Sequence, residues 1–185
     1  MLIDRNNSFL VIVDMQEKLV PAVQKPARVV ETVRILASAS SKLHVPIIVT
    51  EHCPDKIGHT DPALQAAAAP MGHTITKVHF NALAETDNRK TIASLNRRQA
   101  IVCGTETHVC VLQTAMGLLG AGYNVLIVAD GVSSRKKRDR KIALQRLAGK
   151  GADLVTAEMV IFEWLHRADT DDFRITLPLI KSLKN

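Results

Sequence analysis

The sequence predicts an α/β protein in which helices cover both faces of a six-stranded parallel sheet. Short apolar runs of strand length recur along the chain, and FLVIVD at 9–14 is the first of them. Continuous apolar runs of this kind are typical of strands buried on both faces. They alternate with segments of helical periodicity, such as 29–43. Strand–helix–strand repetition places parallel strands in one sheet and their crossover helices on its faces.

Each element follows from its local pattern. Pro46 fits the first positions of its strand, Thr86 is a candidate N-cap, and glycines end the helix that contains Cys110. The expected strands are 9–14, 45–50, 73–80, 99–104, 124–131 and 152–156. The expected helices are 29–43, 86–96, 108–122 and 139–151, followed by two more helical pieces.

Length and composition predict one soluble, cytoplasmic domain over residues 1–185. Apolar residues make up 46% and charged residues 23%, an ordinary globular balance. No apolar run approaches the roughly 20 residues that span a bilayer, and MLIDRNNS does not resemble a signal peptide. The three cysteines form neither a disulfide framework nor a CxxC zinc pair, so we expect reduced thiols.

The net charge of +6 is largely local. Six basic residues and one acid occupy 135–141. A run of this kind at the start of a helix is usually a solvated face, and one Trp, one Tyr and four Phe offer little for base stacking. We therefore expect neither nucleic acid nor a membrane as a partner.

Reactive side chains follow the expected strands. In an open parallel sheet, ligands bind beyond the carboxyl ends of the strands, so these residues are the ones that could share a site. They are Asp14 after the first strand, Glu51, His52 and Cys53 after the second, Lys77, His79 and Phe80 at the third, Cys110 after the fourth, and Asp130 after the fifth.

Cys110 stands at the start of a helix, a position that suits a nucleophile. Unpaired N–H groups and the helix dipole favour a thiolate there, and a nearby Lys77 ammonium would add to this. Asp14 could accept the thiol proton, and the same helix start offers N–H donors to an oxyanion. This predicts acyl transfer at a carbonyl, with a Cys110 pKa below that of a free thiol and faster alkylation than at Cys53 or Cys103.

Each of these residues also has an ordinary structural interpretation. Cys110 could be a small core residue, Asp14 could cap a turn, and Lys77 could be exposed. Cys103, within a buried strand, is expected to be core.

Five stretches together resemble the isochorismatase-like cysteine hydrolase superfamily, in the branch named for isochorismatase-domain content. The resemblance covers nearly the whole chain and implies one isochorismatase-like hydrolase domain over 1–185. The fold that it implies is a three-layer Rossmann-like sandwich with strand order 3-2-1-4-5-6. The stretches are FLVIVDMQ (9–16), VPIIVTE (45–51), ITKVHFNA (75–82), GTETHVCVLQTA (104–115) and NVLIVADGVSSR (124–135).

The resemblance also implies roles for individual residues. Asp14 would be the base, Cys110 the nucleophile, and Lys77 the group that holds the thiolate. A cis peptide bond would join Thr105 and Glu106, and the N–H groups of Glu106 and Cys110 would form the oxyanion hole. Isochorismatases proper lack the nucleophilic cysteine, so isochorismate is not expected as the substrate.

Nicotinamidase-like relatives bind a metal through an Asp-x-His pair and a further histidine after the second strand. The corresponding TEHCPDKIGHT has Glu51, His52 and His59 without that spacing, so we expect no metal and no cofactor. By resemblance we expect a homo-oligomer: a dimer, tetramer or octamer. The candidate substrate-pocket residues are Gln16, Glu51, His52, Cys53, Phe80 and Asn81.

The leading hypothesis is therefore a cysteine-dependent hydrolase of a small amide or related carbonyl compound, acting through a covalent thioester. The alternative is a non-catalytic binding or scaffold protein on the same fold. Nucleic-acid binding through 135–141 is a third hypothesis. A dehydrogenase is disfavoured, because DMQEKLVP after the first strand has no glycine that lets a pyrophosphate approach.

Overall fold

The computed structural model describes residues 2–183 and contains one six-stranded sheet. The strand order is β3-β2-β1-β4-β5-β6 and every neighbouring pair is parallel, which confirms the expected topology. The strands are β1 (Ser8–Val13), β2 (Ile47–His52), β3 (Gly72–Lys77), β4 (Gln99–Thr105), β5 (Asn124–Ser133) and β6 (Asp153–Val155).

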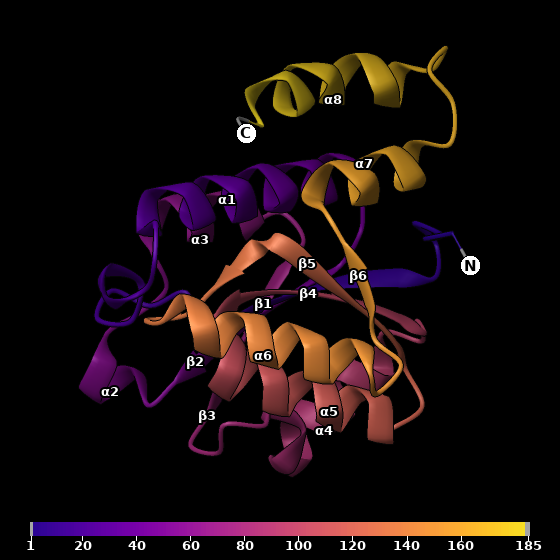
Figure 1. Ribbon diagram of the computed structural model, residues 1–185. Helices are drawn as coiled ribbons and strands as arrows, with labels where there is room; N and C mark the ends of the chain where they lie inside the picture. Colours follow the sequence, from indigo (N-terminus) through magenta and orange to yellow (C-terminus); the bar gives the residue numbers. More distant parts are fainter. Residues whose placement is uncertain (1, 184–185) are drawn as a thin grey trace.

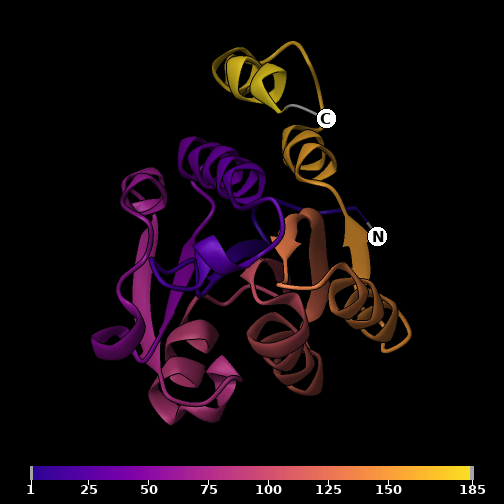
Figure 2. The same ribbon diagram turned by 60° about the vertical axis from the view of Figure 1, so that its left-hand side comes forward.

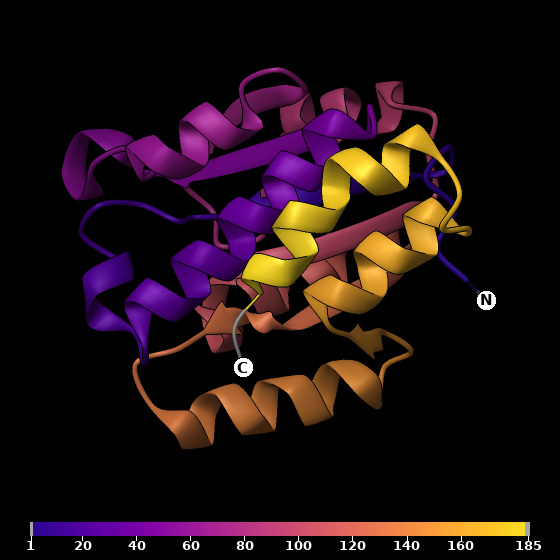
Figure 3. The ribbon, with the colours of Figure 1, turned by 90° about the horizontal axis from the view of Figure 1, so that it is seen from above.

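Helices form a layer on each face of this sheet (Figures 1 and 2). On one face lie α1 (Pro26–Lys42), α3 (Pro62–Ala68), α7 (Ala157–Leu165) and α8 (Asp171–Ser182); on the other lie α4 (Thr86–Ser94), α5 (Leu112–Gly120) and α6 (Lys137–Ala148). The short α2 (Pro54–Ile57) follows β2, and 3-10 turns lie at η1 (Val20–Ala22) and η2 (Ala82–Ala84). Seen from above, α8 crosses over α1 (Figure 3). Among residues 2–183, no helix combines the length and apolarity needed to cross a bilayer.

The sheet divides the core into two apolar clusters. Successive residues of a strand point to opposite faces, so Leu10 and Ile12 of β1 pack toward α1 while Phe9, Val11 and Val13 pack toward α5. All five are fully buried. The doubly buried strand expected from FLVIVD is therefore present, and its carboxyl end is held rigidly between two helical layers.

Two local expectations need correction. Glu85, not Thr86, is the N-cap of α4, and its carboxylate instead accepts hydrogen bonds from the N–H groups of Val78 and His79. The expected helix at 108–122 starts as a π-helical turn, η3 (Thr107–Val111), before α5 begins at Leu112. Cys110 therefore lies in a widened turn, and such turns often occur at functional sites.

Gly104 explains how β4 can lead into this turn. Its φ is +116°, and a Cβ at this position would lie 2.1 Å from the carbonyl oxygen of Val13. Only glycine allows β1 and β4 to approach so closely just before the Cys110 turn.

Candidate active site

Asp14 leaves β1 in a left-handed conformation, with φ of 46°. Its backbone carbonyl accepts a hydrogen bond from Thr105 Oγ1 at 2.7 Å, and its N–H donates to the Thr50 carbonyl at 3.1 Å. Asp14 is fully buried. Neighbouring strands thus fix both the backbone and the direction of the carboxylate.

The Asp14 carboxylate is satisfied by two side chains. Lys77 Nζ, at the end of β3, lies 2.7 Å from Oδ2, and both side chains are 0% exposed. Thr50 Oγ1 donates to Oδ1 at 2.6 Å. A buried charge is tolerated when it is paired and hydrogen-bonded, and this pair meets both conditions.

Cys110 completes the cluster. Its thiol interacts with the Asp14 carboxylate and the Lys77 ammonium, and 5% of the residue is exposed. Residues 63 and 96 positions apart from Asp14 therefore meet at the carboxyl edge of the sheet. The structure brings together the three residues that the sequence singled out.

The expected lowering of the thiol pKa is wrong. Burial raises the pKa of Cys110 to about 12; the Asp14 carboxylate adds to the increase, and the Lys77 ammonium only partly offsets it. The Lys77 ammonium pairs with Asp14 at 2.7 Å and also interacts with the thiol, but its effect on the thiol pKa is smaller than that of burial. The Cys110 thiol therefore keeps its proton at neutral pH.

The turn before Cys110 has the cis peptide bond implied by the resemblance. The peptide bond between Thr105 and Glu106 is cis. The Glu106 carboxylate accepts hydrogen bonds from the Arg135 N–H at 3.1 Å and from Arg135 Nε at 3.0 Å, which ties the turn to the end of β5. Thr107 Oγ1 is buried and has no hydrogen-bond partner among the described residues.

Gln16 and Glu51 are used to hold the loop that follows β2. The Gln16 amide donates to the carbonyls of His52 and Gly58 and accepts the His52 N–H at 2.7 Å. Glu51 accepts two hydrogen bonds from Thr60, each of 2.8 Å. Burial raises the pKa of the Glu51 carboxyl, but the hydrogen bonds from Thr60 and His59 outweigh this, so the net pKa is lowered.

His52 and Phe80 are better placed to face a ligand. Their rings lie 5.2 Å apart, and Phe80 is 46% exposed. Burial lowers the pKa of His52, Lys77 lowers it further, and Asp14 opposes the change. Its Nδ1 is buried without a hydrogen-bond partner in the described chain.

The other two pocket candidates, Cys53 and Asn81, lie outside the Asp14–Lys77–Cys110 cluster. Cys53 lines a cavity of about 520 Å³ together with Lys77 and α2, and its N–H donates to the Lys77 carbonyl at 3.0 Å. Asn81 Oδ1 accepts the Leu83 N–H at 2.9 Å. A Cβ on Gly117 of α5 would lie 2.4 Å from this oxygen, so the Asn81 side chain packs against α5. Within residues 2–183, no group of three or more His, Cys, Asp or Glu side chains is arranged to hold a metal ion.

Sequence reasoning did not single out Thr50, and it named Thr105 only as part of the cis peptide bond and not for its hydroxyl. Thr50 is opposite Val13 in the pairing of β2 with β1, one position before the catalytic candidate Asp14. Thr50 is the last residue of VPIIVT, so its hydroxyl group ends an apolar run. This position was the sequence feature that could have identified it as a site residue. Thr105 carries the same signal at the end of β4.

Comparison with known proteins identifies the family. A sequence model of the isochorismatase domain matches residues 8–159. The chain belongs to the isochorismatase family. Isochorismatase domain-containing protein 2 of Xenopus laevis is 34% identical, over 91% of this chain and 80% of that protein. The secreted isochorismatase effector Isc1 of Phytophthora sojae is 32% identical, over 95% of this chain and 85% of its own.

Solved structures share the whole fold. The MAR1 ribonuclease of Caenorhabditis elegans is 34% identical with a TM-score of 0.93, covering 100% of this chain and 95% of that one. The ycaC gene product of Escherichia coli, described as an octameric hydrolase of unknown specificity, is 25% identical with a TM-score of 0.91, covering 99% and 90%. YcaC of Pseudomonas aeruginosa, solved with hexane-2,5-diol and covalent acrylamide, is 25% identical with a TM-score of 0.89, covering 98% and 95%. Family membership supports a hydrolase role for this chain.

Proposed function

We propose that this protein hydrolyses a small amide or related carbonyl compound through a covalent thioester on Cys110. The observation that carries the proposal is the meeting of Asp14, Lys77 and Cys110 in one buried cluster. A nucleophile, a carboxylate within reach of its proton and a charge that orients the carboxylate are the parts that thiol catalysis needs.

Asp14 acts as the general base. Because the Cys110 thiol is protonated at neutral pH, its proton must leave as sulfur attacks. The Asp14 carboxylate interacts with that thiol and accepts the proton as the S–C bond forms. Lys77 and Thr50 hold the carboxylate in place throughout.

The remaining steps of the cycle require water as the only further reactant. The carbonyl oxygen becomes an oxyanion that the N–H groups of Glu106 and Cys110 receive. Collapse breaks the C–N bond, and protonated Asp14 returns its proton to the leaving amine. Asp14 then deprotonates water, which attacks the thioester, and the acid leaves as the Cys110 thiol is restored.

Relatives add support. Acrylamide reacts with nucleophiles such as thiols at its alkene carbon, and it is covalently held in the YcaC structure from P. aeruginosa, so a nucleophile of that relative is accessible to a small compound. In this chain Cys110 is 5% exposed and Asp14 is fully buried. Because so little of the reacting groups is accessible to solvent, a compact substrate is favoured.

The test is a screen of small amides, ureas and esters with three proteins. Wild type is compared with Cys110→Ala and with the matched control Cys53→Ala, which removes a thiol that lines the neighbouring cavity. We expect turnover in wild type and Cys53→Ala, and a loss of at least about 10³-fold in Cys110→Ala. Turnover that survives in Cys110→Ala would disprove the mechanism.

RNA cleavage is a second candidate function. It is favoured by similarity to a C. elegans protein described as a ribonuclease and by the basic run at 135–141. An end-labelled single-stranded RNA assay with purified protein tests it. Cleavage that persists in Cys110→Ala and falls steeply with salt would support it over the thiol mechanism.

We further propose that the protein is a cytoplasmic homo-oligomer. Its three cysteines are free thiols, as a reducing compartment favours. An E. coli relative is described as an octamer, and large apolar side chains are exposed on α7 and α8, namely Met159, Phe162 and Ile175. Light scattering during size-exclusion chromatography gives the subunit number, and a monomer at micromolar concentration would refute the assembly.

A further inference from the structure

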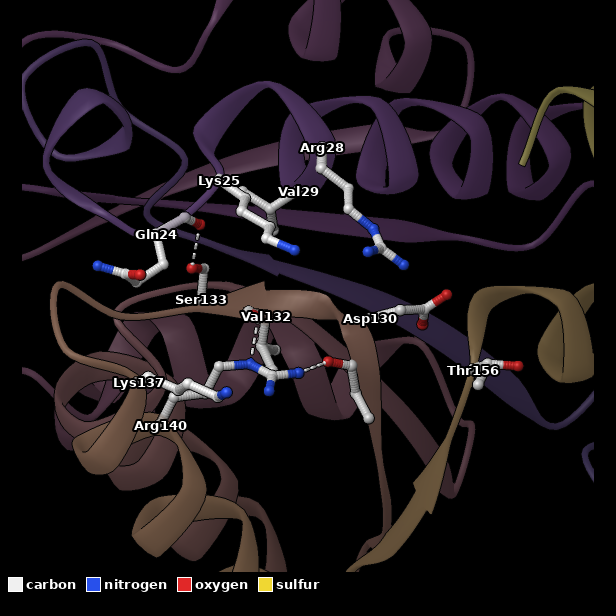
Figure 4. Close-up of a pocket in the computed structure, with 11 residues that line it drawn as sticks. Gln24, Lys25, Arg28, Val29, Asp130, Val132, Ser133, Lys137, Arg140 and Thr156 are labelled. Carbon is white, nitrogen blue, oxygen red and sulfur yellow. Dashed lines mark hydrogen bonds between the residues drawn. The ribbon is translucent and has the colours of Figure 1, made fainter. Parts of the chain in front are cut away.

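A second cavity of about 450 Å³ lies at the carboxyl end of β5, between the first turns of α1 and α6 (Figure 4). Its lining contains none of Asp14, Lys77 and Cys110, so it is separate from the candidate active site. Its volume falls in the usual range for small-molecule sites. We call it the β5 cavity; it is lined by Gln24, Lys25, Arg28, Val29, Ala129, Asp130, Val132, Ser133, Lys137, Arg140 and Thr156.

Cations dominate this lining. Lys25 and Arg28 come from the start of α1, and Lys137 and Arg140 come from the start of α6. Asp130 is the one carboxylate in the lining, and its Oδ1 is occupied by the Ala157 N–H at 2.9 Å. Positive charge is therefore in clear excess.

Most of this charge has no partner among residues 2–183. Arg140 donates to the carbonyls of Val132, at 3.0 Å, and Ala129, which fixes its guanidinium on the cavity wall. Lys25, Arg28 and Lys137 make no side-chain hydrogen bond or ion pair within residues 2–183. In Figure 4, Lys25 and Arg28 extend from α1 toward β5, and the Arg28 guanidinium lies on the side of Asp130.

The cations are close enough to affect one another. Burial lowers the pKa of Arg140; the Asp130 carboxylate opposes this change, and the Arg28 guanidinium adds to it. Mutual repulsion of this kind costs free energy, and an anion placed between the two helices would relieve it.

Helix geometry adds to the positive field. The N-caps of α1 and α6, Lys25 and Lys136, make no side-chain capping hydrogen bond. Both helices begin at the cavity, and helix N-termini carry partial positive charge. The unpaired cations and the two helix starts thus favour the same kind of ligand.

We propose that the β5 cavity binds the phosphate group of a small phosphorylated molecule of about nucleotide size. Phosphate carries up to two negative charges and accepts forked hydrogen bonds from arginine, as Arg28 and Arg140 can supply. The lining contains no aromatic side chain, so it offers nothing on which successive bases of a nucleic acid could stack. This favours a single phosphate ligand over a polymer.

Only some residues of the basic run line the β5 cavity. Lys137 and Arg140 line the cavity because they lie three positions apart on one helix face. Arg138 and Lys141 are exposed and do not line it. The same charge can therefore be removed at the cavity or beside it, which gives a matched control.

Isothermal titration calorimetry at low ionic strength tests the proposal with three probes: inorganic phosphate, adenosine monophosphate and a single-stranded RNA oligonucleotide. Wild type is compared with Lys25→Gln/Arg28→Gln and with the control Arg138→Gln/Lys141→Gln, each lacking two positive charges. A separate Lys137→Gln variant probes the α6 side. All four double-variant positions are exposed, so folding should be preserved, and circular dichroism checks this.

We expect adenosine monophosphate to bind wild type with one site per chain, about tenfold more weakly in Lys25→Gln/Arg28→Gln, and within twofold of wild type in the control. Lys137→Gln should weaken binding by severalfold. The proposal is overturned if neither phosphate nor the nucleotide binds, or if the control pair weakens binding equally. It is also overturned if only the RNA binds, since the run would then be a polymer-binding face.

Discussion

The two charged regions at the carboxyl edge of the sheet differ in how their charges are balanced. In the active-site cluster, Lys77 and Asp14 neutralise each other at 2.7 Å, with both side chains 0% exposed. In the β5 cavity, Lys25, Arg28 and Lys137 have no such partner within the described chain. In the active-site cluster the charges are balanced without a ligand, and the paired groups hold the side chains in place for the reaction. The β5 cavity is left with charge that an anion would balance.

Breaking the buried pair gives the largest expected effect on stability. Lys77→Met leaves the Asp14 carboxylate buried without its cation, with the Thr50 hydroxyl and the Cys110 thiol as side-chain donors. Loss of one partner of a buried pair costs about 3–5 kcal/mol, so we expect the free energy of unfolding to fall by that amount in urea denaturation.

The control for this change is Lys90→Met, which breaks a 3.5 Å pair with Asp87 whose side chains are 75% and 94% exposed. It should leave stability unchanged, since exposed pairs contribute little. The double variant Asp14→Asn/Lys77→Met should be more stable than Lys77→Met alone. Equal losses in Lys77→Met and Lys90→Met would show that burial does not govern the pair.

The reactivity of the cysteine thiols tests how burial affects the active-site cluster. With a pKa of about 12, the Cys110 thiolate fraction at pH 7 is about 10⁻⁵, and it rises tenfold per pH unit until the pKa is reached. Half-buried Cys53 should therefore react first with methyl methanethiosulfonate at pH 7, and the Cys110 rate should still be rising at pH 10.

Peptide mass spectrometry of time-quenched samples gives both rates, and Cys53→Ser isolates the Cys110 signal. A Cys110 rate that levels off below pH 8.5 would mean that Lys77 stabilises the thiolate more than burial and Asp14 oppose it.

The smallest expected effect comes from the β5 cavity. Removing one of its unpaired cations should stabilise the ligand-free protein, because like charges repel. We expect Arg28→Gln to raise the free energy of unfolding by about 0.3–0.5 kcal/mol at low ionic strength, and the gain should vanish in high salt. A loss of stability would mean that Arg28 already has a favourable partner and that the two regions are alike.

The fold could be predicted from the sequence because each strand is a continuous apolar run. The run FLVIVD predicts a strand buried on both faces, whichever strands lie beside it. In the structure β1 and β4 are the two central strands of the sheet. The residues at strand ends could be selected for the same reason, since parallel strands bring their carboxyl ends together.

Other features depend on distances that no sequence pattern contains. Thr50 contacts Asp14 because of the register between β1 and β2. The raised pKa of Cys110 depends on burial and on the nearby Asp14 carboxylate, which a helix start alone does not predict. The basic run at 135–141 is largely exposed, as expected, but the sequence does not show that Lys137 and Arg140 also line a cavity shared with α1.

The proposed mechanism requires the Asp14 carboxylate to remove the proton of the Cys110 thiol. The most direct measurement is the rate of acrylamide addition to Cys110 at pH 7.5 in wild type and Asp14→Asn, with Cys53 modification in the same samples as an internal control. Asp14 as base predicts a fall of about 100-fold at Cys110 and no change at Cys53. If Asp14 only raises the thiol pKa by its charge, removing that charge should speed the reaction, and an unchanged or faster rate would contradict the mechanism.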